Sequence, residues 1–368
     1  MRVVYACSLA SGGPLTHLLD LAPHVARTGA DVTVLCASEG IADEFRRRGV
    51  GATAVPLDHK LDLRGAASLW PLLAGADVVH SHDRRTGLLV RPQARLRGAV
   101  SVHTLHGVPD EIFGLVGRDD GRVEPGVSEA RIRWLLHGLL PVEAGLARLG
   151  TTVVPSAALR RFVVDHGFPE QRTFVVPNGV EVLRSEPSPR HEPFRIATAG
   201  ILEYRKGVDT LLDACALVDV PMHVDVFGDG SLRADLERRA ERLGVDASFH
   251  GTVADVGARL LEVDLFALPT RGDNLPIAIL EAMALALPVV ATRTGGLPEL
   301  VEDGVSGILV EPDDAEGLAA AIGRLAGDED TRFRSGRAGA ARVRERFDAG
   351  DVARQMVALY RRLVARGR

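Results

Sequence analysis

Cysteine, aromatic residues and lysine are scarce in this chain of 368 residues, and long apolar runs are absent. The three cysteines (Cys7, Cys36, Cys215) are scattered through apolar segments, a pattern typical of reduced core thiols and not of a disulfide framework. No apolar run approaches the ~18 residues of a membrane span. The N-terminus also lacks the basic and apolar regions of a secretory signal peptide. We therefore expect a cytoplasmic protein.

Charge and length narrow the class of protein further. A formal net charge of −5 argues against a nucleic-acid partner, because such proteins are usually basic. The chain is longer than one hydrophobic core usually supports, which favours two domains. Only Lys60 and Lys206 are lysines among 44 basic residues. A lysine can thus mark a place where a compact ammonium group matters, although chance is the alternative.

Short β-rich runs alternate with helical segments along the chain, which predicts parallel sheets covered by helices on both faces. The runs lie at residues 2–7, 31–36, 77–82, 99–104, 151–156 and 173–177, and again at 194–200, 222–228, 248–253, 264–270, 288–294 and 306–312. A proline-rich change of composition separates the two series, as is typical of an interdomain linker.

This pattern predicts an α/β protein with two doubly wound, Rossmann-like domains that face each other across a cleft. We expect an N-terminal domain at residues 1–180, a linker at 181–193, a C-terminal domain at 194–345, and a helix at 346–368 that packs back on the N-terminal domain. Ligands of such sheets bind at the carboxyl ends of the strands.

The most unusual stretch is residues 271–296, where Glu281 is the only charge in the apolar run from 277 to 290. A carboxylate in a buried helix is costly unless something satisfies it, which favours a ligand role such as binding two adjacent hydroxyls. Asp273 precedes Pro276 and the expected start of this helix, which Pro288 should end. Taken alone, Asp273 could be a helix cap.

Two cations follow the first strand of the second domain. Arg205 and Lys206 precede Gly207 and the next helix. The two positive charges and the amide groups at the start of that helix could therefore bind the same anion. This arrangement predicts a diphosphate site. A solvated start of a helix is the alternative.

In the first half, Gly12 and Gly13 lie in the turn after the first strand, where backbone can approach a ligand closely. The pattern is not that of a dinucleotide site, and Cys36 ends the second strand where an acid would be needed. His106 follows the strand at 99–104 and could orient a substrate. The nearby His80, His82 and His103 have no cysteine partner and no metal-ligand spacing, so we expect no metal.

These residues carry a resemblance to a known family. The second half resembles the donor-binding domain of the retaining glycosyltransferases of group 1 (family four type), which have the GT-B fold. The matching segments are VVPNGV (175–180), Gly200 to Gly207, FGDGSL (227–232), FHGTV (249–253) and LPTRGDNLPIAILEAMA (268–284). Weaker matches in the first half are GGPLTHLLDLA (12–22) and HTLHG (103–107).

The resemblance implies roles for particular residues. Glu281 would bind the ribose of a nucleotide sugar, Asp273 the hydroxyls of the transferred sugar, and Arg205 and Lys206 the diphosphate. His106 would contact the donor sugar near the reacting centre. The implied catalytic set is His106, Arg205, Lys206 and Asp273. The implied donor site adds Gly13, Asn274, Leu275 and Glu281, and the implied acceptor side is Gly12, Gly13 and His17.

Three positions depart from the family pattern. The family usually has Glu at 273 and often has Arg at 201, where this chain has Asp273 and Ile201. Ala286 replaces a common glycine, which we expect to affect packing only.

The implied function is transfer of a sugar, with retention and without a metal or other cofactor, from a UDP- or GDP-sugar to a glycan, a lipid-linked or a small-molecule acceptor. The alternatives are a GT-B nucleotide-sugar 2-epimerase and a non-catalytic nucleotide-sugar-binding subunit. Two arginine-rich stretches, at 84–97 and 130–141, could rest on the inner face of a membrane and deliver a lipid-linked acceptor. A solvated helix face and a core helix are the alternatives for them.

Overall fold

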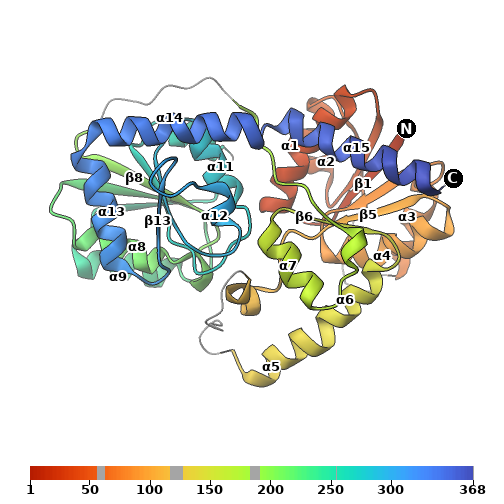
Figure 1. The fold of residues 1–368 in the computed structure, drawn as a ribbon, viewed down its shortest axis with the longest axis horizontal. Helices are drawn as coiled ribbons and strands as arrows, with labels where there is room; N and C mark the ends of the chain where they lie inside the picture. The colour runs from red at the N-terminus through yellow and green to blue at the C-terminus, as the bar shows by residue number, and fades with distance from the viewer. Residues whose placement is uncertain (56–62, 117–126, 183–190, 254, 368) are drawn as a thin grey trace. The chain divides into compact units, whose positions relative to one another are not determined.

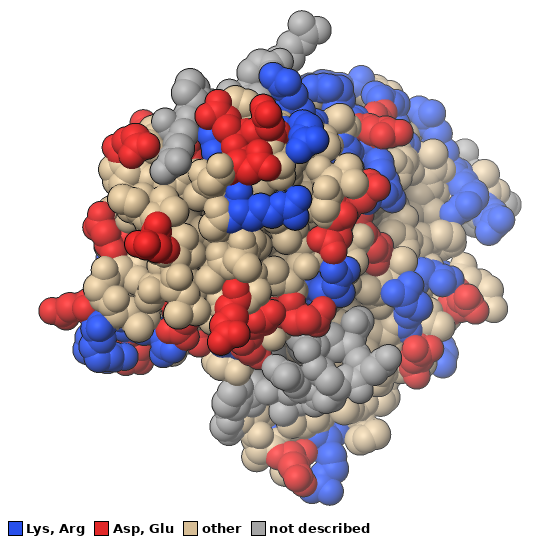
Figure 2. All heavy atoms as spheres, turned by 60° about the vertical axis from the view of Figure 1, so that its left-hand side comes forward, with Lys and Arg blue, Asp and Glu red and all other residues tan. Residues whose placement is uncertain are grey.

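The computed structural model describes residues 1–55, 63–116, 127–182, 191–253 and 255–367, and the chain divides into two compact units (Figure 1). The N-terminal unit comprises Met1–Val108, Ser128–Glu181 and Asp348–Arg368. The C-terminal unit comprises Pro109–Val127 and Val182–Phe347. Each unit has its own sheet and its own hydrophobic core. Figure 2 shows both signs of charge on one face of the molecule, in keeping with the small net charge.

In the N-terminal unit, the described strands form a parallel sheet in the order β3-β2-β1-β4-β5-β6-β7. The strands are β1 (Arg2–Cys7), β2 (Asp31–Cys36), β3 (Gly51–Ala54), β4 (Val78–Ser81), β5 (Val100–Thr104), β6 (Thr151–Val154) and β7 (Thr173–Val175). The helices are α1 (Gly13–Arg27), α2 (Glu39–Arg47), α3 (Leu63–Leu72), α4 (Arg84–Leu96), α5 (Glu129–Trp134), α6 (Leu140–Ala147), α7 (Ala157–Asp165) and α15 (Ala349–Gly367). A π-helical segment, Leu135–Leu139, joins α5 to α6.

The last helix of the chain belongs to the core of the N-terminal unit. α15 packs on α1, and its Met356 and Tyr360 are buried with Tyr5 and Leu18. Because apolar residues recur on one face of α15, burying that face removes it from water and holds the helix against the sheet.

In the C-terminal unit, the described strands form a second parallel sheet in the order β10-β9-β8-β11-β12-β13. The strands are β8 (Phe194–Ala199), β9 (Met222–Phe227), β10 (Ala247–Gly251), β11 (Leu265–Leu268), β12 (Val289–Thr292) and β13 (Ile308–Val310). The helices are α8 (Val208–Ala216), α9 (Arg233–Leu243), α10 (Val256–Leu260), α11 (Ile277–Ala284), α12 (Leu297–Leu300), α13 (Ala315–Gly327) and α14 (Glu329–Arg346), with 3-10 turns η1 (Asp110–Leu115) and η4 (Tyr204–Lys206).

The predicted fold class is confirmed, since both sheets are parallel and doubly wound. In each sheet the strand order reverses once, between β1 and β4 and between β8 and β11. The loops that leave the carboxyl ends of these strands diverge at that point, which makes it the usual ligand position in open α/β sheets. That the two units face each other across a cleft stays a prediction.

The end of α11 differs from the prediction. The helix ends at Ala284, before Pro288, and Ala286 has a φ of 58°. An L-residue with a Cβ adopts this left-handed conformation at a cost of roughly 1–2 kcal/mol. The replacement of glycine at position 286 therefore affects the backbone, and the expectation that it affects packing only is wrong.

In the parts of the chain that the structure describes, no helix has both the length and the apolar character that crossing a membrane requires.

Candidate functional site

The two predicted cations and Asp273 meet at the switch point of the C-terminal sheet. η4 follows β8 and carries Arg205 and Lys206, while the loop after β11 carries Asp273. Lys206 Nζ lies 2.5 Å from Asp273 Oδ2, and Arg205 Nη1 lies 3.3 Å from the same oxygen. All three side chains are largely buried, with 12–15% of their surface exposed. The site therefore combines two positive charges with one negative charge in a largely buried position.

Asp273 stays ionised in this setting. Burial raises the pKa of its carboxyl group, but the charges of Lys206 and Arg205 and the hydrogen bond from Lys206 outweigh burial and lower the pKa overall. The cluster thus carries a net charge of +1 at neutral pH, which suits an anionic ligand.

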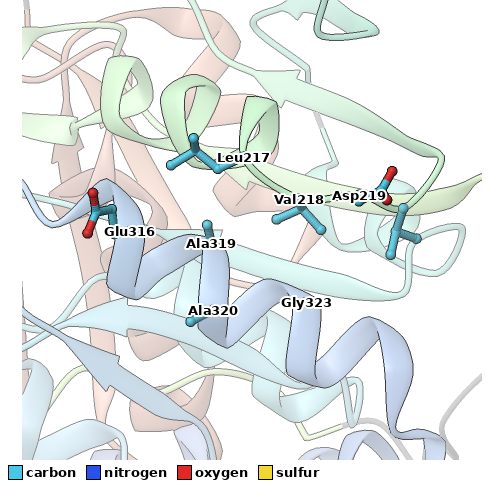
Figure 3. A pocket seen from close by; sticks show the side chains of 8 residues that line it. Leu217, Val218, Asp219, Glu316, Ala319, Ala320 and Gly323 are labelled. Carbon is cyan, nitrogen blue, oxygen red and sulfur yellow. The ribbon is translucent and has the colours of Figure 1, made fainter.

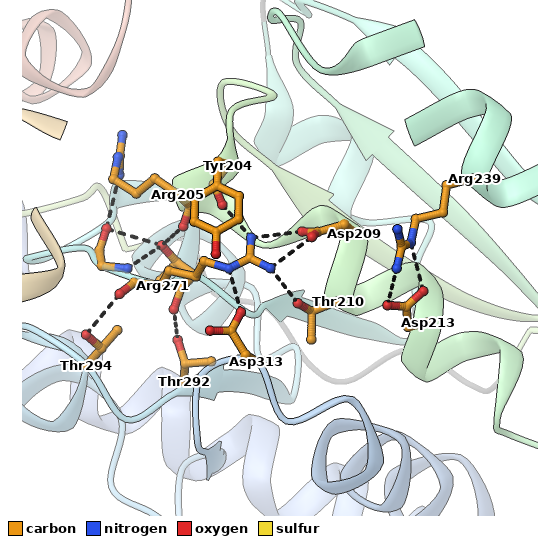
Figure 4. Close-up of polar contacts among 12 residues, drawn as sticks. Tyr204, Arg205, Asp209, Thr210, Asp213, Arg239, Arg271, Thr292, Thr294 and Asp313 are labelled. Carbon is orange, nitrogen blue, oxygen red and sulfur yellow. Dashed lines mark hydrogen bonds and ion pairs between the residues drawn. The ribbon is translucent and has the colours of Figure 1, made fainter. Parts of the chain in front are cut away.

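Arg271 holds the two loops of the site together (Figure 4). Its guanidinium group donates to the carbonyl of Tyr204 at 2.5 Å and binds both carboxylate oxygens of Asp209, at 2.9 and 2.8 Å. It also binds Asp313 at 2.5 Å, and it stacks on the ring of Tyr204. The fork of donors in arginine suits such a junction, which a single ammonium could not make. Arg271 was not predicted as a site residue, and its signal in the sequence was its place two residues before Asp273.

The backbone of Asp273 is fixed from the other side by the loop after β12. The amide of Gly296 donates to the carbonyl of Asp273 at 3.1 Å. Gly295 has a φ of 53°, and a Cβ there would lie 1.8 Å from the same carbonyl oxygen. Only glycine allows this close approach, which explains the glycine at position 295.

Glu281 is half-buried, not fully buried as its apolar surroundings predicted. It lies one helical turn from Ala278, and these two are the partly exposed residues of α11, whose other residues are buried. The sequence pattern failed because Ala278 counts as apolar yet lies on the open face. Asn274 and Leu275 are buried in the loop before α11. Among the described residues, no side chain caps the amino end of α11, and the backbone N–H groups there suit an anion.

A second group of predicted residues lies at the switch point of the N-terminal sheet. Gly12 and Gly13 are exposed at the start of α1, and Gly12 has a φ of 95° that favours glycine. His17 is buried one turn into α1, with its ring 5.3 Å from that of His106. The structure thus brings the predicted acceptor-side residues and His106 into one part of the N-terminal unit.

Buried histidines surround His106. His82 Nδ1 lies 3.4 Å from His106 Nε2, and the ring of His80 lies 4.3 Å from that of His82. Burial lowers the pKa of His17 to about 4. It lowers the pKa values of His80, His82, His103 and His106 well below the usual value, and the nearby histidines lower them further, joined by Arg91 and Arg84 in the case of His103. These imidazoles are therefore neutral at pH 7. The contact between His82 and His106 was not predicted from the sequence.

Among the described residues, a separate shallow pocket of about 520 Å³ lies between the end of α8 and α13 (Figure 3). Its lining is Leu217, Val218, Asp219, Val220, Glu316, Ala319, Ala320 and Gly323. α8 begins near the carboxyl end of β8 and runs back along the sheet. The last residues of α8 therefore lie toward the amino ends of the strands. This pocket is thus distinct from the cluster at Lys206.

Two family models match the chain in succession. "Glycosyltransferase Family 4" matches residues 11–184 and "Glycosyl transferases group 1" matches residues 193–328. The protein belongs to the group 1, family 4 type of glycosyltransferases. The resemblance seen in the sequence is confirmed.

Curated relatives agree with this membership. Sulfoquinovosyl transferase SQD2 of Arabidopsis thaliana is 26% identical over 87% of this chain and 64% of its own length. A D-inositol 3-phosphate glycosyltransferase of Pseudarthrobacter chlorophenolicus is 28% identical over 73% of this chain and 66% of its own length. The chain thus spans just under two thirds of the length of these relatives.

A solved structure shares the fold. Anabaena Alr3699/HepE, in complex with UDP and glucose, superposes with a TM-score of 0.81 over 98% of this chain and 99% of its own, at 21% identity. The two-domain GT-B architecture is therefore that of this protein.

Proposed function

We propose that the protein is a retaining, metal-independent glycosyltransferase that moves a sugar from a nucleoside diphosphate sugar, with UDP or GDP as the nucleotide, to a glycan, glycolipid or small-molecule acceptor. The observation that carries the proposal is the meeting of Arg205, Lys206 and Asp273 at the β8–β11 switch point, in a chain of this family.

The charges of this cluster support a diphosphate ligand. In the protein alone Asp273 neutralises part of the charge of Arg205 and Lys206. A diphosphate brings further negative charge to a cluster whose net charge is +1, and the uncapped amino end of α11 adds backbone N–H groups. In this proposal Glu281, which is partly exposed on α11, accepts hydrogen bonds from the ribose hydroxyls.

In the proposed reaction, the bond between the anomeric carbon and the leaving diphosphate oxygen breaks, the acceptor hydroxyl oxygen bonds to the same face of that carbon, and its proton passes to the leaving phosphate. Lys206 and Arg205 stabilise the negative charge that develops on the leaving phosphate, an electrostatic effect that does not require reorganisation of the site. Asp273, with its lowered pKa, stays ionised to accept hydrogen bonds from sugar hydroxyls. Neutral His106 contributes a hydrogen bond to the donor sugar.

For a lipid-linked acceptor, we propose that α5 and α6 contact the membrane. Trp134 and Val142 are 52% and 56% exposed, and Arg131 and Arg133 are exposed beside them. The other arginine-rich stretch is less suited, because Arg91 is buried in α4. Co-sedimentation with phosphatidylglycerol vesicles but not phosphatidylcholine vesicles, reduced by Trp134→Ser, is the expected result. Equal sedimentation of the variant would refute this surface.

The first prediction tests the donor site. Lys206→Ala should lower kcat for sugar transfer by about 10²–10³-fold, because one charged donor to the leaving group is lost. Glu281→Ala should chiefly raise the donor KM. Arg239→Ala is the matched control, since it breaks an ion pair with Asp213 between α9 and α8 and should leave both constants unchanged (Figure 4).

Rates are measured with UDP- and GDP-sugars that a thermal-shift screen selects, because a bound ligand raises the unfolding temperature. Transfer unaffected by both Lys206→Ala and Glu281→Ala would contradict the donor site. NMR of the product should show the anomeric configuration of the donor, and chelators should not change the rate. Conversion of the nucleotide sugar without acceptor would indicate the epimerase, and binding without turnover the non-catalytic subunit.

A further inference from the structure

One segment from the first half of the chain packs on the cation cluster of the C-terminal unit. The 3-10 turn η1 (Asp110–Leu115) precedes α5 in the sequence, yet Pro109–Val127 belongs to the C-terminal unit. η1 contacts η4, the turn that carries Arg205 and Lys206. The site therefore includes an element that is distant from it in the sequence.

Phe113 of η1 lies against both loops of the cluster. The guanidinium carbon of Arg205 is 4.8 Å from the centre of the Phe113 ring. On the loop after β11, a Cβ at Gly272 would lie 3.0 Å from Phe113 Cδ1 and 3.1 Å from the Phe113 carbonyl oxygen. Phe113 is only 6% exposed, so water is largely kept out of these contacts. The ring thus packs on the cation and on the backbone next to Asp273.

The guanidinium of Arg205 is also held at one edge. Its Nη1 donates to the carbonyl of Gly272 at 3.3 Å and lies 3.3 Å from Asp273 Oδ2. The face of an aromatic ring attracts a guanidinium, more strongly where water is excluded, and a planar guanidinium can stack and donate at once. The ring and the two acceptors together therefore restrict where this guanidinium can lie.

The turn that carries Phe113 is itself anchored. Ile112 and Val116, on either side of Phe113, are fully buried. The amide of Ile112 donates to the carbonyl of Pro109 at 3.0 Å, and the amide of Val116 donates to the carbonyl of Phe113 at 3.1 Å. Because burial of both apolar side chains opposes movement of the turn, the ring is held in place.

We propose that Phe113 is a positioning residue for the donor site: its ring holds the guanidinium of Arg205 where it binds the diphosphate of the nucleotide sugar. Without the ring, the Arg205 side chain gains freedom that binding must remove again, so the diphosphate binds more weakly. The proposal rests on the proposed function for the ligand of Arg205, but the contact between Phe113 and Arg205 is a property of the protein alone.

The first test detects the contact without a ligand. In 15N-arginine-labelled protein, the Nε–H signal of Arg205 is assigned by its loss in Arg205→Met. Its proton shift should change in Phe113→Leu, because an aromatic ring shifts the signals of protons near it. Phe113→Tyr keeps the ring and should leave the signal near its wild-type position. An Arg205 signal that does not move in Phe113→Leu would overturn the proposal.

The second test is a double-mutant cycle, measured by calorimetric titration with UDP or GDP, whichever the wild type binds. Phe113→Leu should weaken binding about fivefold, as expected for loss of one cation–π contact, and Phe113→Tyr less than about twofold. In the Arg205→Met background, Phe113→Leu should have almost no further effect. Phe174→Leu is the matched control, because Phe174 of β7 has Arg362 at the same distance of 4.8 Å in the N-terminal unit; its binding should equal that of the wild type.

Equal weakening by Phe113→Leu with and without Arg205 would show that the ring acts through packing alone and would refute the proposal. If Phe113→Leu does not fold, Phe113→Met, which keeps apolar volume without a ring, takes its place in both tests. Binding of neither nucleotide by the wild type would refute the proposed function and leave the contact between Phe113 and Arg205 standing.

Discussion

For Asp273 and Lys206, the sequence predicted that each belongs to the site but not that they form an ion pair. Lys206 was identified because lysine is rare in this chain and because it follows a strand, and the structure places it against Asp273. Their ion pair could not be predicted, since the residues are far apart in the sequence. Arg271 was missed for the same reason: its partners come from η4, α8 and the start of α13, which only the folded chain brings together.

The lowered pKa of Asp273 makes a prediction about stability. Because the folded-state pKa lies below the usual 3.8, the ion pair stabilises the protein fully above that pH and is lost as the pH falls through the lowered value. The difference in unfolding free energy between wild type and Asp273→Asn should therefore be constant from pH 7 to 5 and shrink below pH 3.8. Urea titrations across this range measure it, and a difference that vanishes already at pH 5 would contradict the pairing.

Among the helices and strands, those with a clear pattern of apolar residues were predicted from the sequence, and those without one were not. The apolar, β-branched strands were predicted to within two or three residues of their observed ends. β3 was missed, since Gly51, Ala52 and Ala54 have little preference for strand and, among the described strands, β3 lies at the edge of the sheet beside β2. The open face of α11 was also missed, because exposure of Ala278 and Glu281 depends on what packs against the helix.

The contact between α11 and α14 gives a prediction at this scale. A Cβ at Gly336 of α14 would lie 2.0 Å from the carbonyl oxygen of Ala286, which the left-handed turn after α11 directs at it. Gly336→Ala should lower the free energy of unfolding by about 1–3 kcal/mol, because backbone must move. Gly323→Ala in α13, whose nearest contact would be 3.9 Å away, should be neutral or stabilising by up to ~1 kcal/mol. Calorimetry checks both, and equal stability of the two variants would contradict the packing described.

At the scale of the whole molecule, the two units differ in their response to acid. Burial is the main cause that lowers the pKa values of six histidines in the N-terminal unit: His17, His24, His80, His82, His103 and His106. Below the usual pKa of 6.5, the unfolded chain takes up protons that the folded unit does not, so stability falls with pH. Burial raises the pKa of Asp20 from 3.8 to about 6. Between these two values the folded unit binds a proton on Asp20 that the unfolded chain does not, which offsets one of the protons that the histidines bind in the unfolded chain.

The N-terminal unit should therefore lose stability as the pH falls below 6.5, with a slope of up to about one proton for each such histidine. Both tryptophans of the chain, Trp70 and Trp134, lie in this unit, so their fluorescence in urea titrations reports on it. His17→Gln should show a slope smaller by about one proton. A urea midpoint that does not move between pH 7 and 5 would contradict neutral burial of these side chains.

If the β8–β11 switch point binds the diphosphate of a nucleotide sugar, calorimetric titration with UDP and GDP should detect it. Wild-type protein should bind at least one of the two nucleotides. Lys206→Ala should weaken this binding about tenfold or more, as expected for a lost charge-assisted contact of at least ~1.4 kcal/mol, while Arg239→Ala should not. Binding of neither nucleotide by the wild type, or equal binding by Lys206→Ala, would contradict a diphosphate site at the β8–β11 switch point.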